Sequence, residues 1–309
     1  MQFTVTVPAT TANLGPGFDC LGLAVALYNT LEVRSREEGL LVSVEGEGQG
    51  LIALDHSNLM VAAMQRLAAH VGRPLPGLHL RQINHIPVSS GLGSSAAATL
   101  AGVLAANRLL DEPLSPGELL DMAVTIEGHP DNMAPALFGG LILANRDGER
   151  LLLEQLPIAE QRVVVVLPQF ALSTFEARAV LPRQVSLADT VFNLGRVGLL
   201  LRALAEGDYE KLDKAMDDRL HQPYRLPLIP GMQAAFAAAR AAGAQGVALS
   251  GAGPSAVAFA ARSHEAVADA MRGAFAAAGL ESRAWILEID REGSRVDGNI
   301  GMAKWWNAR

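Results

Sequence analysis

The alternation of apolar and polar residues divides the chain into a series of predicted strands and helices. In the first half, strands are predicted at 2–8, 21–35, 40–46, 78–86, 140–146 and 150–154, and helices at 58–71, 94–110 and 116–127. In the second half, strands are predicted at 162–167, 246–250, 255–261 and 283–289, and helices at 187–206, 208–217, 231–242 and 264–279. This order predicts an α+β protein of two domains, 1–158 and 159–309, the second an α/β sandwich.

Two segments of this pattern carry further information. Residues 162–167 are nearly all valine, which is typical of a central strand buried on both faces. The tail from Asp290 shows no periodic pattern, and we assign no role to Trp305-Trp306.

Composition narrows the class of protein. The chain has 309 residues, of which 50% are hydrophobic and 18% charged, and a net charge of −7, a balance that is typical of a soluble globular protein. No basic patch stands out, which argues against nucleic acid as a partner. Cys20 is the single cysteine, so no intramolecular disulfide can form. No signal peptide or apolar run of membrane-spanning length is seen, so we expect a cytoplasmic protein.

The strongest candidate for chemistry is a glycine-rich turn, Pro87–Ala97, between a predicted strand and a predicted helix. Free N–H groups and the positive end of the helix dipole make such a turn an anion site. Gly91 and Gly93 would let a phosphate approach the backbone, and the hydroxyls of Ser94 and Ser95 could reach Mg²⁺. The alternative is an ordinary loop in which Ser94 caps the helix.

Two other nucleotide-binding loops do not fit this turn. A Walker loop ends in Gly-Lys-Ser/Thr, but the three lysines, Lys211, Lys214 and Lys304, do not follow a glycine turn. A Rossmann loop needs an acidic residue at the end of a second strand, whereas Asp111 ends the predicted helix.

The N-terminal segment Pro8–Gly22 interrupts two strands with glycines and short polar side chains. Asn13 and Asp19 could make only local turn bonds, or they could be polar groups of a substrate pocket.

Ser115–Glu118 is a capping box, and the helix that it starts ends near Glu127. A carboxylate at a helix C-terminus is unfavourable, and a bound Mg²⁺ would compensate for it. His129, Asp131 and Asn132 follow at once; the alternative for this stretch is a loop in which Asp131 caps a short helix.

The second half adds three polar or glycine-rich segments. Arg178 follows Ser173-Thr174, and Arg225 ends His221-Gln-Pro-Tyr-Arg225; both arginines would matter if the pocket binds a carboxylate. Ser250–Ser255 is either a tight hairpin or a second glycine turn that closes over the site.

Together these motifs resemble the GHMP small-molecule kinases, and within them the homoserine kinase branch. The matching segments are Pro8–Gly22, the Pro-x-x-x-Gly-Leu-Gly-Ser-Ser-Ala-Ala loop, Glu127-Gly-His-Pro-Asp-Asn132, Thr174–Arg178, His221–Arg225 and Ser250–Ser255. The resemblance implies an N-terminal ribosomal-protein-S5-domain-2-like domain and a C-terminal ferredoxin-like domain. It further implies Mg²⁺- and ATP-dependent phosphorylation of the L-homoserine hydroxyl, a step towards threonine, with a homodimer as the family-like assembly.

The resemblance also assigns roles to residues. The implied ATP-binding residues are Asn58, Pro87, Val88, Ser89, Ser90, Gly91, Leu92, Gly93, Ser94, Ser95, Ala96 and Ala97. The implied substrate-binding residues are Asn13, Asp19, His129, Arg178 and Arg225. The implied catalytic residues are Glu127, Asn132 and Thr174, and the implied metal ligands are Ser95 and Glu127.

Asn132 departs from the mevalonate and galactose branches, which resemble one another in having an aspartate base near this position. Asparagine is no useful proton acceptor at neutral pH, so we expect direct transfer without an aspartate base. Two alternatives stay open: another GHMP kinase, for example of isoprenoid precursors, and a nucleotide-binding regulator on the same fold without turnover. An isoprenoid-precursor substrate has no ammonium and carboxylate pair, so it would leave Asn13, Asp19, Arg178 and Arg225 unused. A regulator without turnover should lack Glu127 or the glycine loop, and this chain has both.

Overall fold

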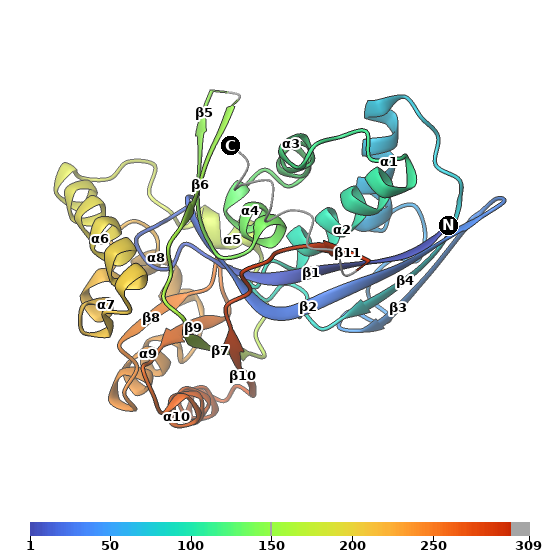
Figure 1. The fold of residues 1–309 in the computed structure, drawn as a ribbon. Coiled ribbons are helices and arrows are strands. Elements are labelled where there is room, and N and C mark those ends of the chain that lie inside the picture. The colour runs from blue at the N-terminus through green and yellow to red at the C-terminus, as the bar shows by residue number, and fades with distance from the viewer. Residues whose placement is uncertain (149, 298–309) are drawn as a thin grey trace.

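The computed structural model describes residues 1–148 and 150–297, and these residues form two lobes, each built on one β-sheet (Figure 1). The first lobe has a seven-stranded sheet and the second a four-stranded sheet. The two-domain α+β architecture predicted from the sequence is confirmed.

The first sheet has the strand order β11-β1-β2-β4-β3, and a hairpin of β5 and β6 extends from β2. Its strands are β1 (Gln2–Ala12), β2 (Leu21–Arg36), β3 (Leu40–Gly46), β4 (Gly77–Asn84), β5 (Leu141–Asp147), β6 (Arg150–Leu156) and β11 (Arg295–Val296). β3 and β4 are parallel because helix α1 connects them, and the other pairs are antiparallel.

Four helices accompany this sheet (Figure 1). They are α1 (Leu59–Val71), α2 (Ser94–Leu109), α3 (Pro116–Glu127) and α4 (Pro130–Phe138). α2 and α4 pack directly against the strands of the sheet, and α1 and α3 pack against α2. α2 is the central one, and its Ala- and Leu-rich sequence is buried around most of its circumference. The sequence pattern allows a short helix here only as an alternative, with Asp131 as its cap, because α4 has nine residues and Pro135 within it interrupts the helical pattern.

The second sheet has the order β10-β7-β9-β8. Its strands are β7 (Arg162–Pro168), β8 (Gly246–Leu249), β9 (Ala256–Phe259) and β10 (Ser282–Glu288). β7 is central as predicted: Val163 and Val165 belong to one hydrophobic core, and Val164 and Val166 to the other. Alternate valines therefore face opposite sides of the sheet.

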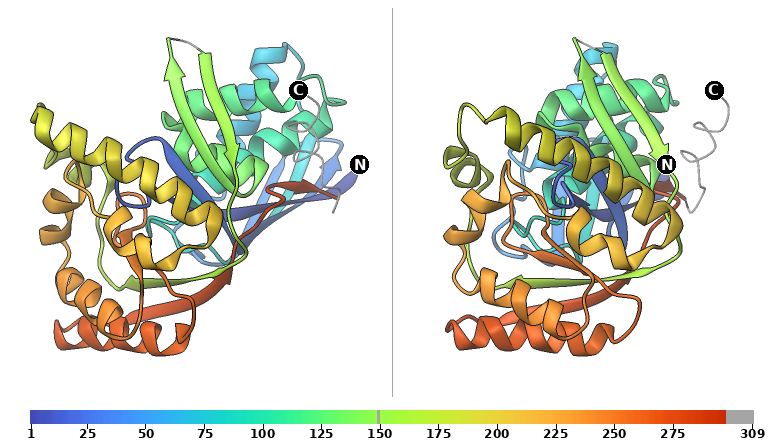
Figure 2. Two further views of the ribbon diagram at one scale, coloured as in Figure 1. Left: turned by 60° about the vertical axis from the view of Figure 1, so that its left-hand side comes forward. Right: turned by 90° about the vertical axis from the view of Figure 1, so that its left-hand side faces the viewer.

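Helices cover both faces of the second sheet (Figure 2). The helices of this lobe are α5 (Thr174–Ala179), α6 (Leu187–Glu206), α7 (Tyr209–Ala215), α8 (Gln222–Arg225) with a following 3₁₀ turn (Leu226–Leu228), α9 (Met232–Ala241) and α10 (His264–Ala277). α9 and α10 pack side by side on the face opposite α6 and α7. The short helices α5 and α8, which the pattern analysis did not predict, approach the other lobe.

The chain after β10 returns to the first lobe. Val296 in β11 pairs with Val5 in β1, and Asp290 accepts a hydrogen bond from Tyr28. The sequence of this segment has no periodic pattern, so its pairing with β1 was not predicted; Trp305-Trp306 lies outside the described residues.

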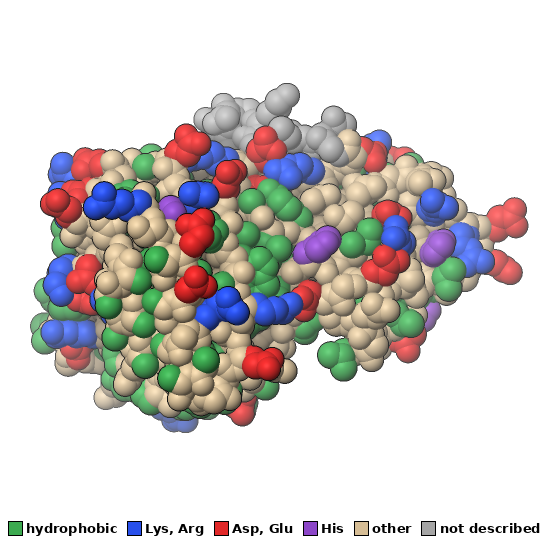
Figure 3. Space-filling view, turned by 90° about the horizontal axis from the view of Figure 1, so that it is seen from below, with side chains coloured by type: hydrophobic (Ala, Val, Ile, Leu, Met, Phe, Trp, Pro, Cys, Tyr) green, Lys and Arg blue, Asp and Glu red, His purple; other side chains and the backbone are tan. Residues whose placement is uncertain are grey.

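One face of the molecule carries charged side chains of both signs (Figure 3). On the face drawn in Figure 3, the coloured Lys and Arg side chains alternate with Asp and Glu and form no continuous basic patch. Within residues 1–148 and 150–297, no helix has the length and apolar character that a membrane span needs.

Candidate active site

A cavity of about 520 Å³ lies between the two lobes and collects nearly all the residues singled out in the sequence. Its walls come from the loops after β1 and β4, the first turn of α2, the α3–α4 junction, α5, α8 and the β8–β9 turn. Of the predicted site residues, only Pro87, Leu92 and Ala97 do not line it; all three are buried beside it.

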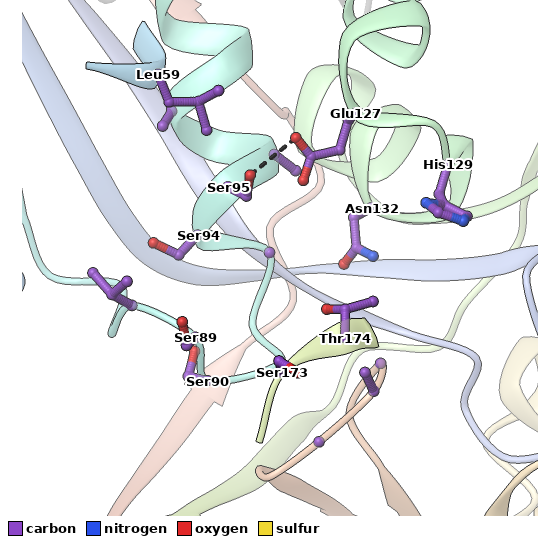
Figure 4. A pocket seen from close by; sticks show the side chains of 18 of the residues that line it. Leu59, Ser89, Ser90, Ser94, Ser95, Glu127, His129, Asn132, Ser173 and Thr174 are labelled. Atoms are coloured by element: carbon purple, nitrogen blue, oxygen red, sulfur yellow. Dashed lines mark hydrogen bonds between the residues drawn. The ribbon is translucent and has the colours of Figure 1, made fainter. Parts of the chain in front are cut away.

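The glycine-rich loop leads into α2 as predicted, but Gly93 is the N-cap residue and not Ser94. Gly93 has φ 70° and no side chain to cap the helix, so Ser94 and Ser95 stand in the first turn. The N–H groups of this turn have no partner within the helix and are available to an anion. Ser94 and Ser95 both line the cavity (Figure 4).

The two glycines are needed for a reason that the sequence did not indicate. A Cβ on Gly91 would lie 2.4 Å from the carbonyl oxygen of Ser250, and one on Gly93 would lie 2.1 Å from Oγ1 of Thr10. Each φ is also positive, at 79° and 70°. The glycines therefore let other parts of the protein approach the loop, which fixes its shape before any phosphate binds.

The turn between β8 and β9 contacts this loop directly. Oγ of Ser250 donates to the carbonyl of Gly91 over 2.7 Å, and the N–H of Ser255 donates to the carbonyl of Ser90 over 3.1 Å. The segment Ser250–Ser255 is thus a hairpin turn and also a second glycine turn at the site, so both interpretations of the sequence hold.

Glu127 ends α3 and points at the first turn of α2 (Figure 4). Its Oε2 accepts hydrogen bonds from Oγ of Ser95 at 2.9 Å and Oγ1 of Thr99 at 3.5 Å. No group of three or more His, Cys, Asp or Glu suited to a metal occurs in the described part of the chain. One carboxylate and one hydroxyl beside a phosphate site nevertheless suit Mg²⁺, which is usually held by one or two carboxylates and by substrate phosphates.

The opposite end of the cavity is acidic. Asp19 and Asp131 both line it, and Asp131 is only 4% exposed. Burial, reinforced by the charge of Asp19, raises the pKa of Asp131 to about 6. Burial and the same two carboxylates raise the pKa of the Cys20 thiol to about 11. Asp19 already pairs with Arg178, so the buried carboxylate of Asp131 is the group here that a cationic partner would stabilise most.

Asp131 is the site residue that the sequence analysis missed. It was considered only as a helix cap, but His129 occupies the N-cap position of α4 and Asp131 lies within the first turn. Its position between His129 and Asn132, two predicted site residues, was the available signal.

Arg178 pairs with Asp19 across the lobes. Its Nη1 and Nη2 donate to the two carboxylate oxygens of Asp19 over 3.1 and 2.8 Å, which is the two-pronged geometry typical of Arg and a carboxylate. Asp19 itself has φ 57°, and its N–H donates to Oδ1 of Asn13. Asp19 and Arg178, the acidic and the basic residue predicted to bind the substrate, are thus neighbours.

Arg225 is 1% exposed, although it lines the cavity. Its Nε donates to the carbonyl of Ala177 over 3.0 Å, and its Nη1 to the carbonyl of Gly251 over 3.3 Å. Burial and the neighbouring positive charge of Arg178 lower its pKa to about 10, so it remains a cation at neutral pH. No described carboxylate forms an ion pair with it within 4 Å.

Asn132 in α4 and Thr174 in α5 lie at the middle of the cavity, and His129 lies at the N-cap of α4 (Figure 4). Oδ1 of Asn132 accepts from Oγ1 of Thr10 over 2.8 Å, and its Nδ2 donates to Oδ1 of Asp131 over 3.3 Å. The amide nitrogen is therefore the group that Asn132 can offer to a ligand.

Asn58 also lines the cavity, but its side chain makes its hydrogen bonds to other groups of the protein. Its side chain accepts from the N–H of Met60 as the cap of α1 and donates to the carbonyl of Ala53. Its predicted role near the nucleotide base remains a prediction.

Comparison with known proteins gives a consistent result. The family model "GHMP kinases N terminal domain" matches residues 58–140, and "GHMP kinases C terminal" matches residues 200–277. The chain is 49% identical to a homoserine kinase of Moorella thermoacetica over 90% of this chain and 94% of that one. It is 46% identical to a homoserine kinase of Microchaete diplosiphon over 94% and 96% of the two chains.

Solved structures show the same fold. A homoserine kinase from Cytophaga hutchinsonii superposes with a TM-score of 0.86 at 32% identity and covers 96% of this chain and 97% of its own. An L. major mevalonate kinase in complex with R-mevalonate gives a TM-score of 0.73 at 21% identity over 93% and 96% of the two chains, which shows the shared fold alone.

Proposed function

The chain belongs to the homoserine kinases of the GHMP kinase family, and on that premise we propose that it transfers the γ-phosphoryl group of ATP to the side-chain hydroxyl of L-homoserine. The product is O-phospho-L-homoserine, in a step towards threonine. The observation that carries the proposal is one cavity with a phosphate-binding loop at one end and acidic and arginine groups at the other.

The end of the cavity away from the glycine-rich loop carries both carboxylates and arginines, which complement the ammonium and the carboxylate of an amino acid. Asp19 and Asp131 would face the ammonium of homoserine, and Arg178 and Arg225 its carboxylate. Asp19 and Arg178 also pair with each other. A zwitterion can replace this pair on both sides, so neither residue is left with an unpaired charge.

The phosphates of ATP would lie along residues 87–97 and the N-terminus of α2. We assign Mg²⁺ to Ser95 and Glu127, whose oxygens are already adjacent. When bound, Mg²⁺ neutralises charge on the β- and γ-phosphates and so favours transfer.

The reaction forms a bond from the homoserine hydroxyl oxygen to the γ-phosphorus and breaks the bond from phosphorus to the β–γ bridging oxygen. Asn132, through Nδ2, and Thr174 would orient the hydroxyl and the transferred group. Asn132 cannot take up the hydroxyl proton, and we assign Asp131 to the ammonium because it lies in the acidic end with Asp19. The proton therefore leaves late, to phosphate or water.

The proposal is tested by incubating the protein with Mg·ATP and L-homoserine and following the products by ³¹P NMR. Homoserine-dependent formation of a phosphate monoester together with ADP is expected. ADP formed at the same rate without homoserine, or no turnover by a folded and ATP-binding protein, would contradict it.

A further inference from the structure

His221 lies behind the acidic and arginine end of the cavity, and the function proposed above gives it no role. Its side chain is fully buried, at 0% exposure. Its ring stacks on Phe18, with centroids 5.0 Å apart and planes 22° apart. It does not line the cavity, but it contacts Arg225, which does.

The two polar partners of His221 fix the position of its proton. Nε2 lies 2.8 Å from the carbonyl oxygen of Gly15, and because a carbonyl only accepts, Nε2 must carry the hydrogen. Nδ1 lies 3.3 Å from Nη1 of Arg225, and because a guanidinium only donates, Nδ1 must be the acceptor. Both contacts require the same neutral tautomer.

The surrounding charges are consistent with this tautomer. Asp218 lies 3.5 Å from Nε2, on the side that carries the hydrogen. Burial, together with the nearby Arg225, lowers the pKa of His221 against the opposing effects of Asp218, the Gly15 hydrogen bond and Asp19.

The neutral imidazole therefore connects the two lobes at the substrate end. Gly15 belongs to the loop that carries Asn13 and Asp19, and Arg225 belongs to the second lobe. The guanidinium of Arg225 lies 5.1 Å from the centroid of the Phe18 ring. His221 and Phe18 thus hold one arginine in place beside the loop that presents the acidic groups.

We propose that His221 is a positioning residue for carboxylate recognition: its Nδ1 accepts from Arg225 while its Nε2–H donates to Gly15, so the guanidinium is aimed at the substrate carboxylate. The proposal rests on the proposed function, because it takes homoserine as the substrate and Arg225 as a carboxylate ligand. It predicts that the acceptor at Nδ1 matters for homoserine binding beyond the packing of the ring.

Two substitutions separate the hydrogen bond that Nδ1 of His221 accepts from Arg225 from the one that Nε2–H donates to Gly15. In His221→Asn, the amide oxygen can stand near the Nδ1 position and keep an acceptor for Arg225. In His221→Gln, the amide nitrogen can reach the Nε2 position and keep the donor to Gly15. Both variants lose the ring and its stacking on Phe18, so each is the other's control.

The experiment measures KM and kcat by ADP release for L-homoserine and for 3-amino-1-propanol, which has the hydroxyl and the ammonium but no carboxylate, with a thermal melt of each variant. His221→Gln is expected to raise the KM for homoserine about tenfold above that of His221→Asn, the scale of one charged hydrogen bond. The two variants should not differ on 3-amino-1-propanol, nor in an Arg225→Leu background, where the acceptor has no partner.

Equal KM values for homoserine in the two folded variants would overturn the proposal. A difference in KM between the two variants that persists with 3-amino-1-propanol, or in the Arg225→Leu background, would overturn it as well. Unfolding of both variants would overturn it too, because His221 would then serve the fold. An Arg225→Leu enzyme with the wild-type KM would instead contradict the carboxylate assignment of the proposed function, and a wild-type protein inactive on homoserine would contradict the function itself.

Discussion

Oγ of Ser95 donates a hydrogen bond to Oε2 of Glu127 over 2.9 Å, and this contact joins the N-terminal turn of α2 to the C-terminal end of α3. The negative charge of Glu127, unfavourable at the C-terminal end of its own helix, lies at the positive N-terminal end of the preceding helix, α2. Glu127 thus has a structural partner in Ser95, and the two residues present oxygen atoms beside the glycine-rich loop.

Glu127→Gln should leave the fold intact, because it removes a charge from a helix C-terminus. It should raise the Mg²⁺ concentration that gives half-maximal rate by roughly ten- to a hundredfold, the cost of a lost charged interaction. The measurement is the rate across a Mg²⁺ titration, with Glu160→Gln, an exposed carboxylate elsewhere, as control. An unchanged titration curve would remove Glu127 from the metal site.

Arg178→Leu and Arg225→Leu should each raise the KM for homoserine. The loss of a charged hydrogen bond costs on the order of 1.5–3 kcal/mol, which is roughly ten- to a hundredfold in KM. The KM for ATP should change little, and Arg262→Leu, on an exposed turn, should change neither. If both variants bind homoserine normally, the arginines do not recognise its carboxylate.

Asp131 should make stability depend on pH. Its pKa is raised from 3.8 to about 6 in the folded protein, so its contribution to stability is fully present below pH 4 and is lost as the pH rises through 6. In Asp131→Asn no carboxyl is left to ionise at this position, so the variant does not lose this stability as the pH rises. The difference in unfolding free energy between the variant and the wild type should therefore grow by about 3 kcal/mol from pH 4 to pH 7 in urea melts. A difference that does not change with pH would mean that Asp131 is not held in a low-polarity site.

If no residue acts as a general base, kcat/KM for homoserine and kcat should depend differently on pH. If Asp131 binds the ammonium, kcat/KM for homoserine should fall as the pH drops through about 6, because the protonated carboxyl loses its charge. kcat at saturating homoserine and Mg·ATP should show no such acidic limb. A limb in kcat that disappears in Asp131→Asn would make Asp131 the general base.

Asn132 is tested by two substitutions. Asn132→Ala should lower kcat without removing a titrating step, because the amide only positions groups. Asn132→Asp should not raise kcat, since a new anion would repel the ATP phosphates. A faster Asn132→Asp enzyme with a new acidic limb would show that this position can use a base.

Regular elements were largely predictable from the sequence because their signals are local. The valines of 162–167 indicate a strand buried on both faces, and the glycine turn before the Ala-rich helix predicts an anion site. α4 remained only an alternative because it is short and Pro135 interrupts its helical pattern, and β11 was missed because two residues carry no periodicity.

The contacts within the site depend on residues that are distant in the sequence. Arg178 and Asp19 are 159 residues apart, and nothing near either indicates their pairing. The complete burial of Arg225 runs against the usual exposure of arginine, and only the assembled lobes supply its carbonyl partners. The same holds for Gly91, whose close neighbour Ser250 comes from the second lobe.

The most direct test of the central claim is a substrate panel. Mg-dependent ADP release is measured for L-homoserine, mevalonate and galactose at equal concentrations, with ATP saturating. Because a zwitterion alone satisfies both the acidic groups and the arginines, kcat/KM for homoserine should exceed that for the other two by at least about a hundredfold, the scale of unpaired buried charges. Comparable or higher kcat/KM for mevalonate or galactose would contradict the account.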